Sequence, residues 1–205
     1  MMGPKEKKER SLGERLHLKG ERCQSPKCAM VRKPHRPGMH GQKRKPKALS
    51  DFGLQLREKR KFKVSYGIDD AALRTLFNRA HTKSGATGAR LIELLERRLD
   101  NVIFRLGFAP SRINARQLVS HGHIMVNGKR VRAPGYEVRP KDVIGVWAGS
   151  RETHHFKNRK EKMGPYEPPN WLHLDRDAWE GRVLSVPADV DIPFEVNVLV
   201  ESFSK

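Results

Sequence analysis

The clearest pattern of apolar positions in the chain lies between Ala89 and Gly107. Apolar residues recur there at steps of three and four, as in an amphipathic helix; they are Leu91, Leu94, Leu95, Leu99, Val102, Ile103 and Leu106. The charged residues between them form the opposite face. The spacing therefore predicts one helix that continues to Leu106 and ends at Gly107.

A shorter pattern follows in residues 111–131, SRINARQLVSHGHIMVNGKRV. Ser111 can cap a helix by accepting a hydrogen bond from a free amide of the first turn. Gly122 stands where a left-handed helix end is favoured, and Asn127-Gly128 is typical of a type I′ hairpin turn. We expect a helix, a glycine stop and a two-strand hairpin with strands 123–126 and 129–131.

The remaining elements are predicted from shorter signals. A helix begins at Ser50 or Asp51 and enters the basic run 57–63, and a second helix is capped by Asp69 or Asp70. Residues 136–138 and 143–147 read as strands, and the alternation of Val196, Val198 and Val200 indicates another. Residues 1–47 are interrupted by proline and glycine, which predicts an irregular segment that folds on a nucleic acid.

The net charge of the chain indicates which class of partner it binds. The 205 residues carry a formal net charge of +19, and such an excess points to a polyanionic partner. Residues 1–63 hold 20 of the 42 lysines and arginines. The chain has no long apolar run, which argues against a membrane span. Two cysteines without an export signal suggest reduced thiols in the cytoplasm.

Several stretches resemble a known family. RLDNVIFRLGF (98–108) and the segment 111–131 resemble the RNA-binding module named after small-subunit ribosomal protein S-four. LHLKGERCQSPKCA (16–29), PGMHGQKRKP (37–46), LSDFGLQLREKRK (49–61), PNWLHLD (169–175) and LVESFSK (199–205) resemble the bacterial S-four family itself. The chain is identified as a member of that family, because the resemblance covers nearly its full length in the family's order.

The resemblance implies an α+β fold with three parts. They are an extended basic N-terminal segment, a mostly helical domain, and a small RNA-binding module of two helices packed on a short antiparallel sheet. We place the N-terminal segment at 1–47, the helical domain at 48–96 joined by the C-terminal segment 167–205, and the module at 97–166.

The resemblance also implies the function: a structural component of the small ribosomal subunit in the cytoplasm. Family members bind small-subunit ribosomal RNA (rRNA) directly and nucleate assembly of the 5′ domain and body. They line the messenger RNA (mRNA) entry channel beside ribosomal proteins S-three and S-five, and they influence accuracy. Some repress translation of their own operon.

We expect rRNA contacts from basic and polar residues of two regions, since arginine can span phosphate oxygens or stack on a base. The candidates are Arg97, Arg98, Arg112, Arg116, Gln117, His121, His123, Asn127, Lys129 and Arg130, with Arg57, Lys59, Arg60, Lys61 and Lys63 as a second surface. The alternative is that these residues are solvated charges on an amphipathic helix beside an ordinary hairpin. Asp100 instead pairs with an arginine to hold the module's shape.

A further basic cluster follows PGMHG and consists of Lys43, Arg44, Lys45 and Lys47. The resemblance places it near incoming mRNA, where a diffuse positive surface attracts any sequence. The alternative is that these side chains anchor the N-terminal segment to rRNA.

No cofactor is expected. Many relatives carry four N-terminal cysteines that bind a metal, usually zinc, whereas here Cys23 and Cys28 remain and Glu6 and Glu9 align with the earlier pair. Two thiolates are half of a structural site, and we expect free thiols. The alternative is that nearby histidines, among His17, His35 and His40, complete the site.

An enzyme is the main competing class, because the same module is fused to RNA-modifying domains. The sequence has no phosphate-binding loop, dinucleotide fingerprint or metalloprotease motif, and His121 and His123 form no evident acid–base pair. A stress-type RNA binder would lack the flanking segments, and nothing resembles a dimeric major-groove reader of DNA. We expect a non-enzymatic RNA-binding protein.

Overall fold

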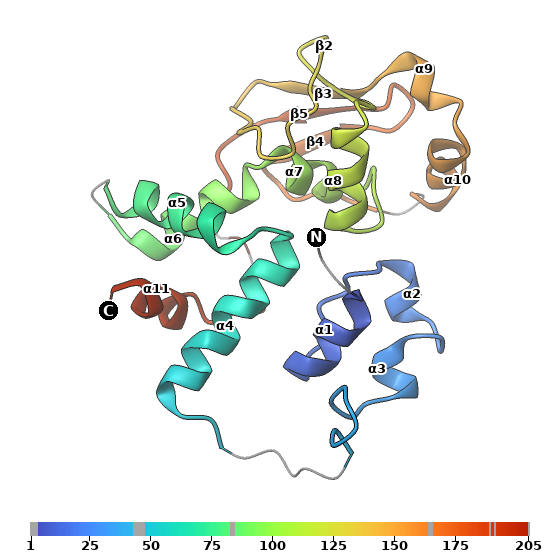
Figure 1. The fold of residues 1–205 in the computed structure, drawn as a ribbon. Helices are drawn as coiled ribbons and strands as arrows, with labels where there is room; N and C mark the ends of the chain where they lie inside the picture. Colours follow the sequence, from blue (N-terminus) through green and yellow to red (C-terminus); the bar gives the residue numbers. More distant parts are fainter. Residues whose placement is uncertain are drawn as a thin grey trace. The chain divides into compact units, whose positions relative to one another are not determined.

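The chain divides into two compact units, seen in a computed structural model (Figure 1). The structure describes residues 4–42, 48–82, 85–163, 166–188, 190 and 192–204. Unit 1 comprises Met1–Gly88 and Ile192–Lys205, and unit 2 comprises Ala89–Asp191. Helices and one antiparallel sheet together give the predicted α+β fold. None of the helices in these ranges has both the length and the apolar composition needed to cross a membrane.

Unit 1 is helical. Its helices are α1 (Lys5–Leu12), α2 (Glu21–Gln24), α3 (Ala29–Arg32), α4 (Asp51–Tyr66), α5 (Asp70–His81) and α11 (Val196–Ser204). The predicted caps are confirmed: Ser50 Oγ accepts from Gly53 N at 3.3 Å, and Asp69 Oδ1 accepts from Ala72 N at 2.8 Å. These caps satisfy amides that the first turn of α4 and of α5 leaves free.

The N-terminal segment differs from the extended form that we predicted. Three short helices occupy residues 5–32, and Leu12, Leu18, Cys23 and Cys28 are buried among them. The fully buried carboxylate of Glu9 holds the loop after α1, because its Oε1 accepts from Leu16 N and Leu18 N at 3.1 Å each. Proline and glycine limited the length of these helices without preventing them.

Residues 196–204 form helix α11 and not the predicted strand. Phe194 packs on Phe62 of α4, with ring centroids 4.9 Å apart, and Phe203 stacks on Phe77 of α5 at 4.6 Å. Glu195 N also donates to Glu58 Oε2 at 3.4 Å. The last described segment therefore completes the core of unit 1.

The described residues of unit 2 form five helices and a five-stranded sheet. The helices are α6 (Thr87–Glu96), which begins two residues before the boundary, α7 (Leu99–Arg105), α8 (Arg112–Ser120), α9 (Ala148–Arg151) and α10 (His154–Lys162). The predicted single helix over 91–106 is thus wrong, because it breaks at Arg97 and Arg98. There the backbone turns to meet residues 136–138: Leu99 N donates to Tyr136 O at 2.8 Å, and Arg98 bridges to Glu137.

The sheet has the order β2-β1-β3-β5-β4, and all its neighbours are antiparallel. The strands are β1 (Ile124–Val126), β2 (Lys129–Arg130), β3 (Val143–Val146), β4 (Leu172–Asp175) and β5 (Glu180–Val183). The predicted strand over 136–138 is reduced to the single bridge at Glu137. β4 and β5 lie in unit 2, so of the segment 167–205 only residues 192–205 join the helical unit.

The core of unit 2 lies between α7, α8 and the sheet. Leu99, Ile103 and Leu106 are fully buried there with Ile124 and Ile144. Helix α7 approaches the sheet closely at Gly181, where a Cβ atom would lie 2.5 Å from the methyl groups of Leu106. This packing leaves the polar face of α8 and the β1–β2 hairpin at the surface.

Candidate nucleic-acid interface

Helix α8 and the hairpin have the local structure that the sequence predicts. Ser111 Oγ accepts from Asn114 N at 3.3 Å, and Gly122 adopts φ +76° just after the helix. Asn127 and Gly128 have φ values of +49° and +77°, as a type I′ turn requires. Asn127 is also a structural residue, because its side chain donates to Asp142 Oδ1 and accepts from Val143 N, at 2.8 and 2.9 Å.

A buried carboxylate organises the basic side chains between α6 and α8. Glu96 is 0% exposed and accepts from Arg105 Nε at 2.9 Å and Asn101 Nδ2 at 2.8 Å. Arg112 Nη2 lies 3.7 Å from Glu96 Oε1. Burial alone would raise the pKa of Glu96, but the hydrogen bonds and positive charges of Arg105 and Arg112 outweigh burial and lower this pKa.

A second carboxylate, Asp100, has the shape-holding role that we predicted. Arg98 binds it through two parallel hydrogen bonds, from Nε at 3.1 Å and Nη2 at 2.8 Å. Arg116 approaches the same carboxylate at 3.5 Å but remains 44% exposed. Arg98 is therefore a buried structural residue, whereas Arg116 still presents most of its donors to solvent.

Arg97 and Arg112 are also engaged within unit 2. Arg97 Nη1 pairs with Glu93 at 2.9 Å, and its Nε donates to Val138 O at 3.0 Å. Arg112 Nε donates to Asn101 Oδ1 at 2.7 Å, and its guanidinium lies 4.8 Å from the ring centroid of Phe104. Both side chains are partly exposed, so each combines contacts within unit 2 with a guanidinium group that solvent can partly reach.

His123, one of the predicted rRNA contacts, is held within unit 2. Its Nδ1 is 2.8 Å from Ser150 Oγ, and the side chain is half-buried. Burial, followed by the nearby His121 and Arg130, lowers the pKa of His123. The neutral imidazole is thus favoured at pH 7, and this side chain links the hairpin to α9.

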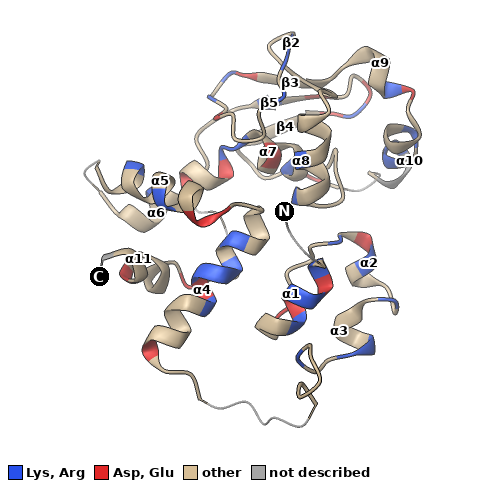
Figure 2. Cartoon of the chain, viewed as in Figure 1, with Lys and Arg blue, Asp and Glu red and all other residues tan. Residues whose placement is uncertain are grey.

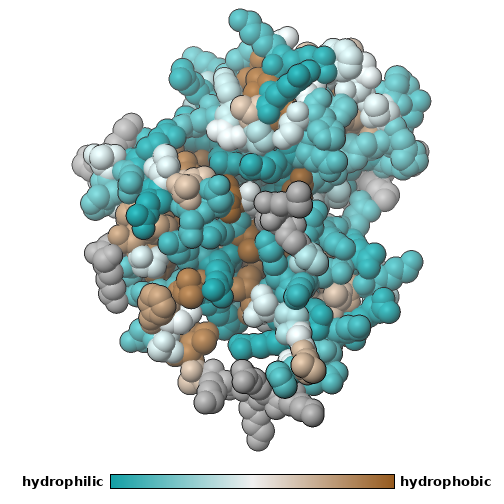
Figure 3. Space-filling view, in the orientation of Figure 1, coloured by the Kyte–Doolittle hydropathy of each residue, from teal (hydrophilic) through white to brown (hydrophobic). Residues whose placement is uncertain are grey.

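In unit 2, the exposed candidates other than the turn residue Asn127 lie on α8, just after it, and on the hairpin. We call this the α8–hairpin surface; it consists of Arg116, Gln117, His121, Lys129 and Arg130. Lysine and arginine positions on α8 and the hairpin appear in blue in Figure 2, and mostly hydrophilic side chains cover this part of unit 2 in Figure 3. Such a surface presents flexible donors to phosphate oxygens.

Two residues beside this surface were not among the site residues predicted from the sequence. Arg132 follows the hairpin and is exposed, and Trp147 follows β3 and is 37% exposed. Arg130 lies over the Trp147 ring, with Cζ 4.1 Å from the centroid. An aromatic residue beside a predicted basic hairpin was the available signal, but strand pairing was needed to bring the two together.

The second basic surface, on α4, is largely paired within unit 1. Lys59 and Lys63 contact Asp70 at 3.5 and 3.0 Å, and Arg57 contacts Glu14 at 3.1 Å. Lys61 is buried and pairs with Glu14 and Glu58. Arg60 is exposed. Four of the five predicted side chains thus contribute to the stability of unit 1, and Arg60 faces solvent. Lys43, Arg44, Lys45 and Lys47 lie outside the described residues.

The cysteine region is described in full, and its acidic residues have partners within the chain. Cys23 and Cys28 are buried free thiols, and burial chiefly raises the pKa of Cys23. Glu6 instead pairs with Arg22 at 3.0 Å, while Glu9 binds the loop amides described above. Across the described ranges, no three histidine, cysteine or acidic side chains are grouped to hold a metal ion.

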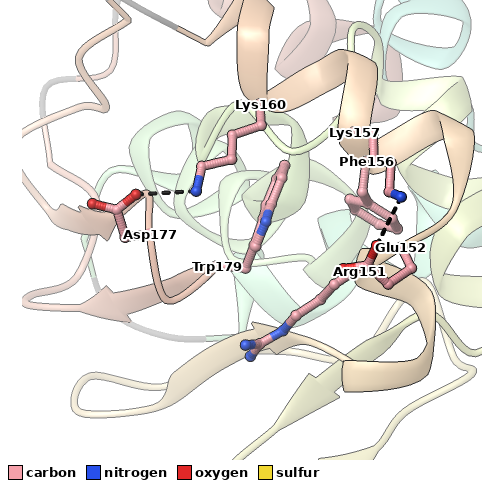
Figure 4. Close-up of a pocket in the computed structure, with 7 residues that line it drawn as sticks. All are labelled: Arg151, Glu152, Phe156, Lys157, Lys160, Asp177 and Trp179. Atoms are coloured by element: carbon pink, nitrogen blue, oxygen red, sulfur yellow. Dashed lines mark ion pairs between the residues drawn. The ribbon is translucent and has the colours of Figure 1, made fainter.

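A cavity of about 530 Å³ in unit 2 is a poorer place for a polyanion (Figure 4). Both of its lysines are already paired: Lys157 with Glu152 at 2.8 Å, and Lys160 with Asp177 at 3.1 Å. Its aromatic residues are buried and support the core. The lining residues are Arg151, Glu152, Phe156, Lys157, Lys160, Asp177 and Trp179.

Comparison with known proteins identifies the family. Residues 1–96 match the ribosomal protein S4/S9 N-terminal domain, and residues 97–144 match the S4 domain. Small ribosomal subunit protein uS4 of Thermoanaerobacter sp. (strain X514) is 48% identical over 195 residues, covering 94% of this chain and 93% of that protein. The uS4 proteins of Thermus thermophilus and Acetivibrio thermocellus are 48% and 47% identical over the same shares. The chain therefore belongs to the small ribosomal subunit protein uS4 family, whose members are ribosomal structural proteins and not enzymes.

Proposed function

We propose that this chain binds small-subunit rRNA directly through the α8–hairpin surface of unit 2. The observation that carries the proposal is the exposure of Arg116, Lys129 and Arg130 beside neutral donors, while the arginines nearer the core are held by Glu96 and Asp100. The paired arginines fix the shape of the surface, and the exposed cations contact phosphates. Each phosphate contact releases counterions, so binding should weaken steeply with salt.

The test is the affinity of the full chain for a small-subunit rRNA transcript over a series of salt concentrations. The double variant Arg116→Glu/Lys129→Glu should bind more weakly and show a shallower dependence of log K on log salt. The matched control is the double variant Arg182→Glu/Arg139→Glu, which changes the net charge equally at exposed positions outside α8 and the β1–β2 hairpin. Equal losses in the two variants would show a general charge effect and overturn the proposed surface.

We further propose a role in assembly of the 5′ domain and body of the small subunit, and with it a location in the cytoplasmic ribosome. The S4 domain and the nearly full-length similarity to uS4 proteins support this role. Reconstitution of the subunit with the Arg116→Glu/Lys129→Glu variant should slow protection of 5′-domain nucleotides from chemical probes. Normal protection kinetics with a weakened binary affinity would contradict a nucleating role.

The position at the mRNA entry channel, beside ribosomal proteins S-three and S-five, and the influence on accuracy are proposed from the family resemblance. Lys43, Arg44, Lys45 and Lys47 would then attract incoming message without fixed bonds. Replacing them by alanine should impair translation of structured mRNA more than subunit assembly. Poor assembly with equal relative translation of structured and unstructured messages would make the cluster an rRNA anchor.

Repression of the chain's own operon is a separate proposal with a separate test. It rests on the same resemblance and requires that one RNA-binding surface accept two targets. Excess chain added to a translation extract should then reduce synthesis from its own operon's leader, and added rRNA fragment should relieve that reduction. No reduction at a concentration that saturates the rRNA fragment would contradict it.

A further inference from the structure

Arg130 and Trp147 form an exposed stack on unit 2. The guanidinium Cζ of Arg130 lies 4.1 Å from the indole centroid, and its Nε donates to the carbonyl oxygen of Gly122 at 3.0 Å. Arg130 belongs to β2, and Trp147 follows β3, so the side chain reaches across the intervening strand β1. One face of the guanidinium is thereby covered by the indole, and one of its five N–H donors is used.

The backbone holds the indole in place. Trp147 N donates to His123 O at 2.9 Å, and the next helix is tied to the same histidine through Ser150. At Gly149 a Cβ atom would lie 2.5 Å from Cη2 of Trp147, so glycine provides the space that the ring occupies. The ring is therefore positioned before any partner arrives, which lowers the entropic cost of binding.

The surroundings of the stack are positive. Arg132 Nε also lies close to Gly122, where a Cβ atom would be 2.9 Å from it. Within the part of the chain that the structure describes, neither Arg130 nor Arg132 makes an ion pair with a carboxylate. The outer face of the Arg130 guanidinium and the donors of Arg132 are thus available to an anionic, planar ligand.

We propose that the Arg130–Trp147 stack is a binding site for one unpaired RNA base. The base lies on the outer face of the guanidinium, which forms the middle layer between base and indole, and Arg132 contacts the adjoining phosphate. This inference rests on the proposed rRNA binding and deepens it. A phosphate alone would use the in-plane donors of arginine, whereas a base uses its face, and a base within a duplex has both faces covered by its neighbours.

The first experiment separates stacking from charge with an rRNA transcript and the full chain. Trp147→Ala keeps the charge and removes the platform, so we expect about tenfold weaker binding with an unchanged salt slope. Gly149→Ala should displace the ring and reduce affinity in the same way, although it keeps the indole. Arg130→Lys keeps the charge but loses the planar group and should behave like Trp147→Ala.

The matched control is Lys129→Ala, which removes an exposed charge from the same hairpin without touching the stack. It should make the salt slope shallower by about 0.7–0.9. A thermal unfolding curve is recorded for every variant, to check that the variant is folded. Parental affinity in Trp147→Ala, or in Arg130→Lys, would overturn the proposed base site. Absence of binding by the parent chain itself would instead overturn the proposed function.

A second readout follows the indole directly. Trp171 and Trp179 are each 5% exposed, so Trp147 dominates quenching of tryptophan fluorescence by acrylamide. Single-stranded RNA should reduce that quenching more than an RNA duplex of equal length and charge does, and Trp147→Phe should abolish the difference. Equal protection by the two RNAs, or none by either, would contradict recognition of an unpaired base.

Discussion

Arg112 Nε donates a hydrogen bond of 2.7 Å to Asn101 Oδ1. Asn101 in turn donates to the buried carboxylate of Glu96, so Arg112 is the outer member of a polar network. The neighbouring Arg116, one helical turn along α8, has only a 3.5 Å approach to Asp100. Two arginines that share a helix face in the sequence are therefore held to different degrees by the rest of unit 2.

The first prediction follows from that difference. Arg112→Ala should lower the free energy of unfolding by about 1–2 kcal/mol, because it leaves a buried network short of one charged donor. Arg116→Ala should change stability by about 0.5 kcal/mol or less and reduce rRNA affinity and its salt slope. Denaturant unfolding and salt-dependent binding measure the two effects. Equal losses of stability in Arg112→Ala and Arg116→Ala would contradict the different roles of the two arginines.

The second prediction concerns pH. The pKa of Glu96 is lower in the folded chain than its ordinary value of 4.5. Its charged form therefore contributes stability that is fully present above about pH 4.5 and is lost as the pH falls through the depressed folded value. Glu96→Gln should flatten the decline of the melting temperature between about pH 5 and pH 3. The control is the exposed Glu167→Gln, and an equal flattening there would contradict the role of Glu96.

A third prediction tests the N-terminal helices. Glu9→Ala leaves the amides of Leu16 and Leu18 without their acceptor, so residues 5–32 should become sensitive to protease in the free chain. The loss should correspond to about 1–3 kcal/mol of local stability. Glu9→Gln keeps an acceptor oxygen and should retain most of the protection. Rapid cleavage of the parent chain in residues 5–32 would show that the segment is unfolded in the free chain, and slow cleavage of Glu9→Ala would show that Glu9 does not hold it.

The fourth prediction concerns Cys23 and Cys28. Both thiols are buried, and burial raises the pKa of Cys23, so the neutral thiol predominates at pH 7. The purified chain should hold well under one equivalent of zinc, and its thiols should react with an alkylating agent mainly after unfolding. Elemental analysis and mass spectrometry measure both. A full equivalent of zinc that disappears in Cys23→Ser would contradict this prediction.

Local signals determined which elements the sequence could predict. The caps at Ser50, Asp69 and Ser111 and the Asn127-Gly128 turn satisfy nearby backbone groups, and each is found as expected. The break between α6 and α7 has no such signal, because the apolar spacing continues across it. It arises from pairing of Arg98 with Glu137, which lies far along the chain.

The error in the last predicted element, over residues 196–200, also arises from contacts with residues far along the chain. Val196, Val198 and Val200 fit an alternating strand, but contacts of Phe203 with Phe77 and of Phe194 with Phe62 stabilise a helix. The sequence could name candidate residues of the site but not their surroundings: it shows that Arg98 and Lys61 are basic, but not that each is buried beside a carboxylate. The Arg130–Trp147 stack likewise depends on strand order.

The division of the chain has a consequence for its synthesis. Unit 2 is one continuous stretch, whereas unit 1 is interrupted after Gly88 and resumes at Ile192. During translation all residues of unit 2 are therefore made before α11, whose Phe203 completes the contact with Phe77. Since domains fold as their residues emerge, the later part of the chain should reach its final form first. The nascent protein would then present the proposed RNA-binding surface while helices α4 and α5 still lack their contacts with α11.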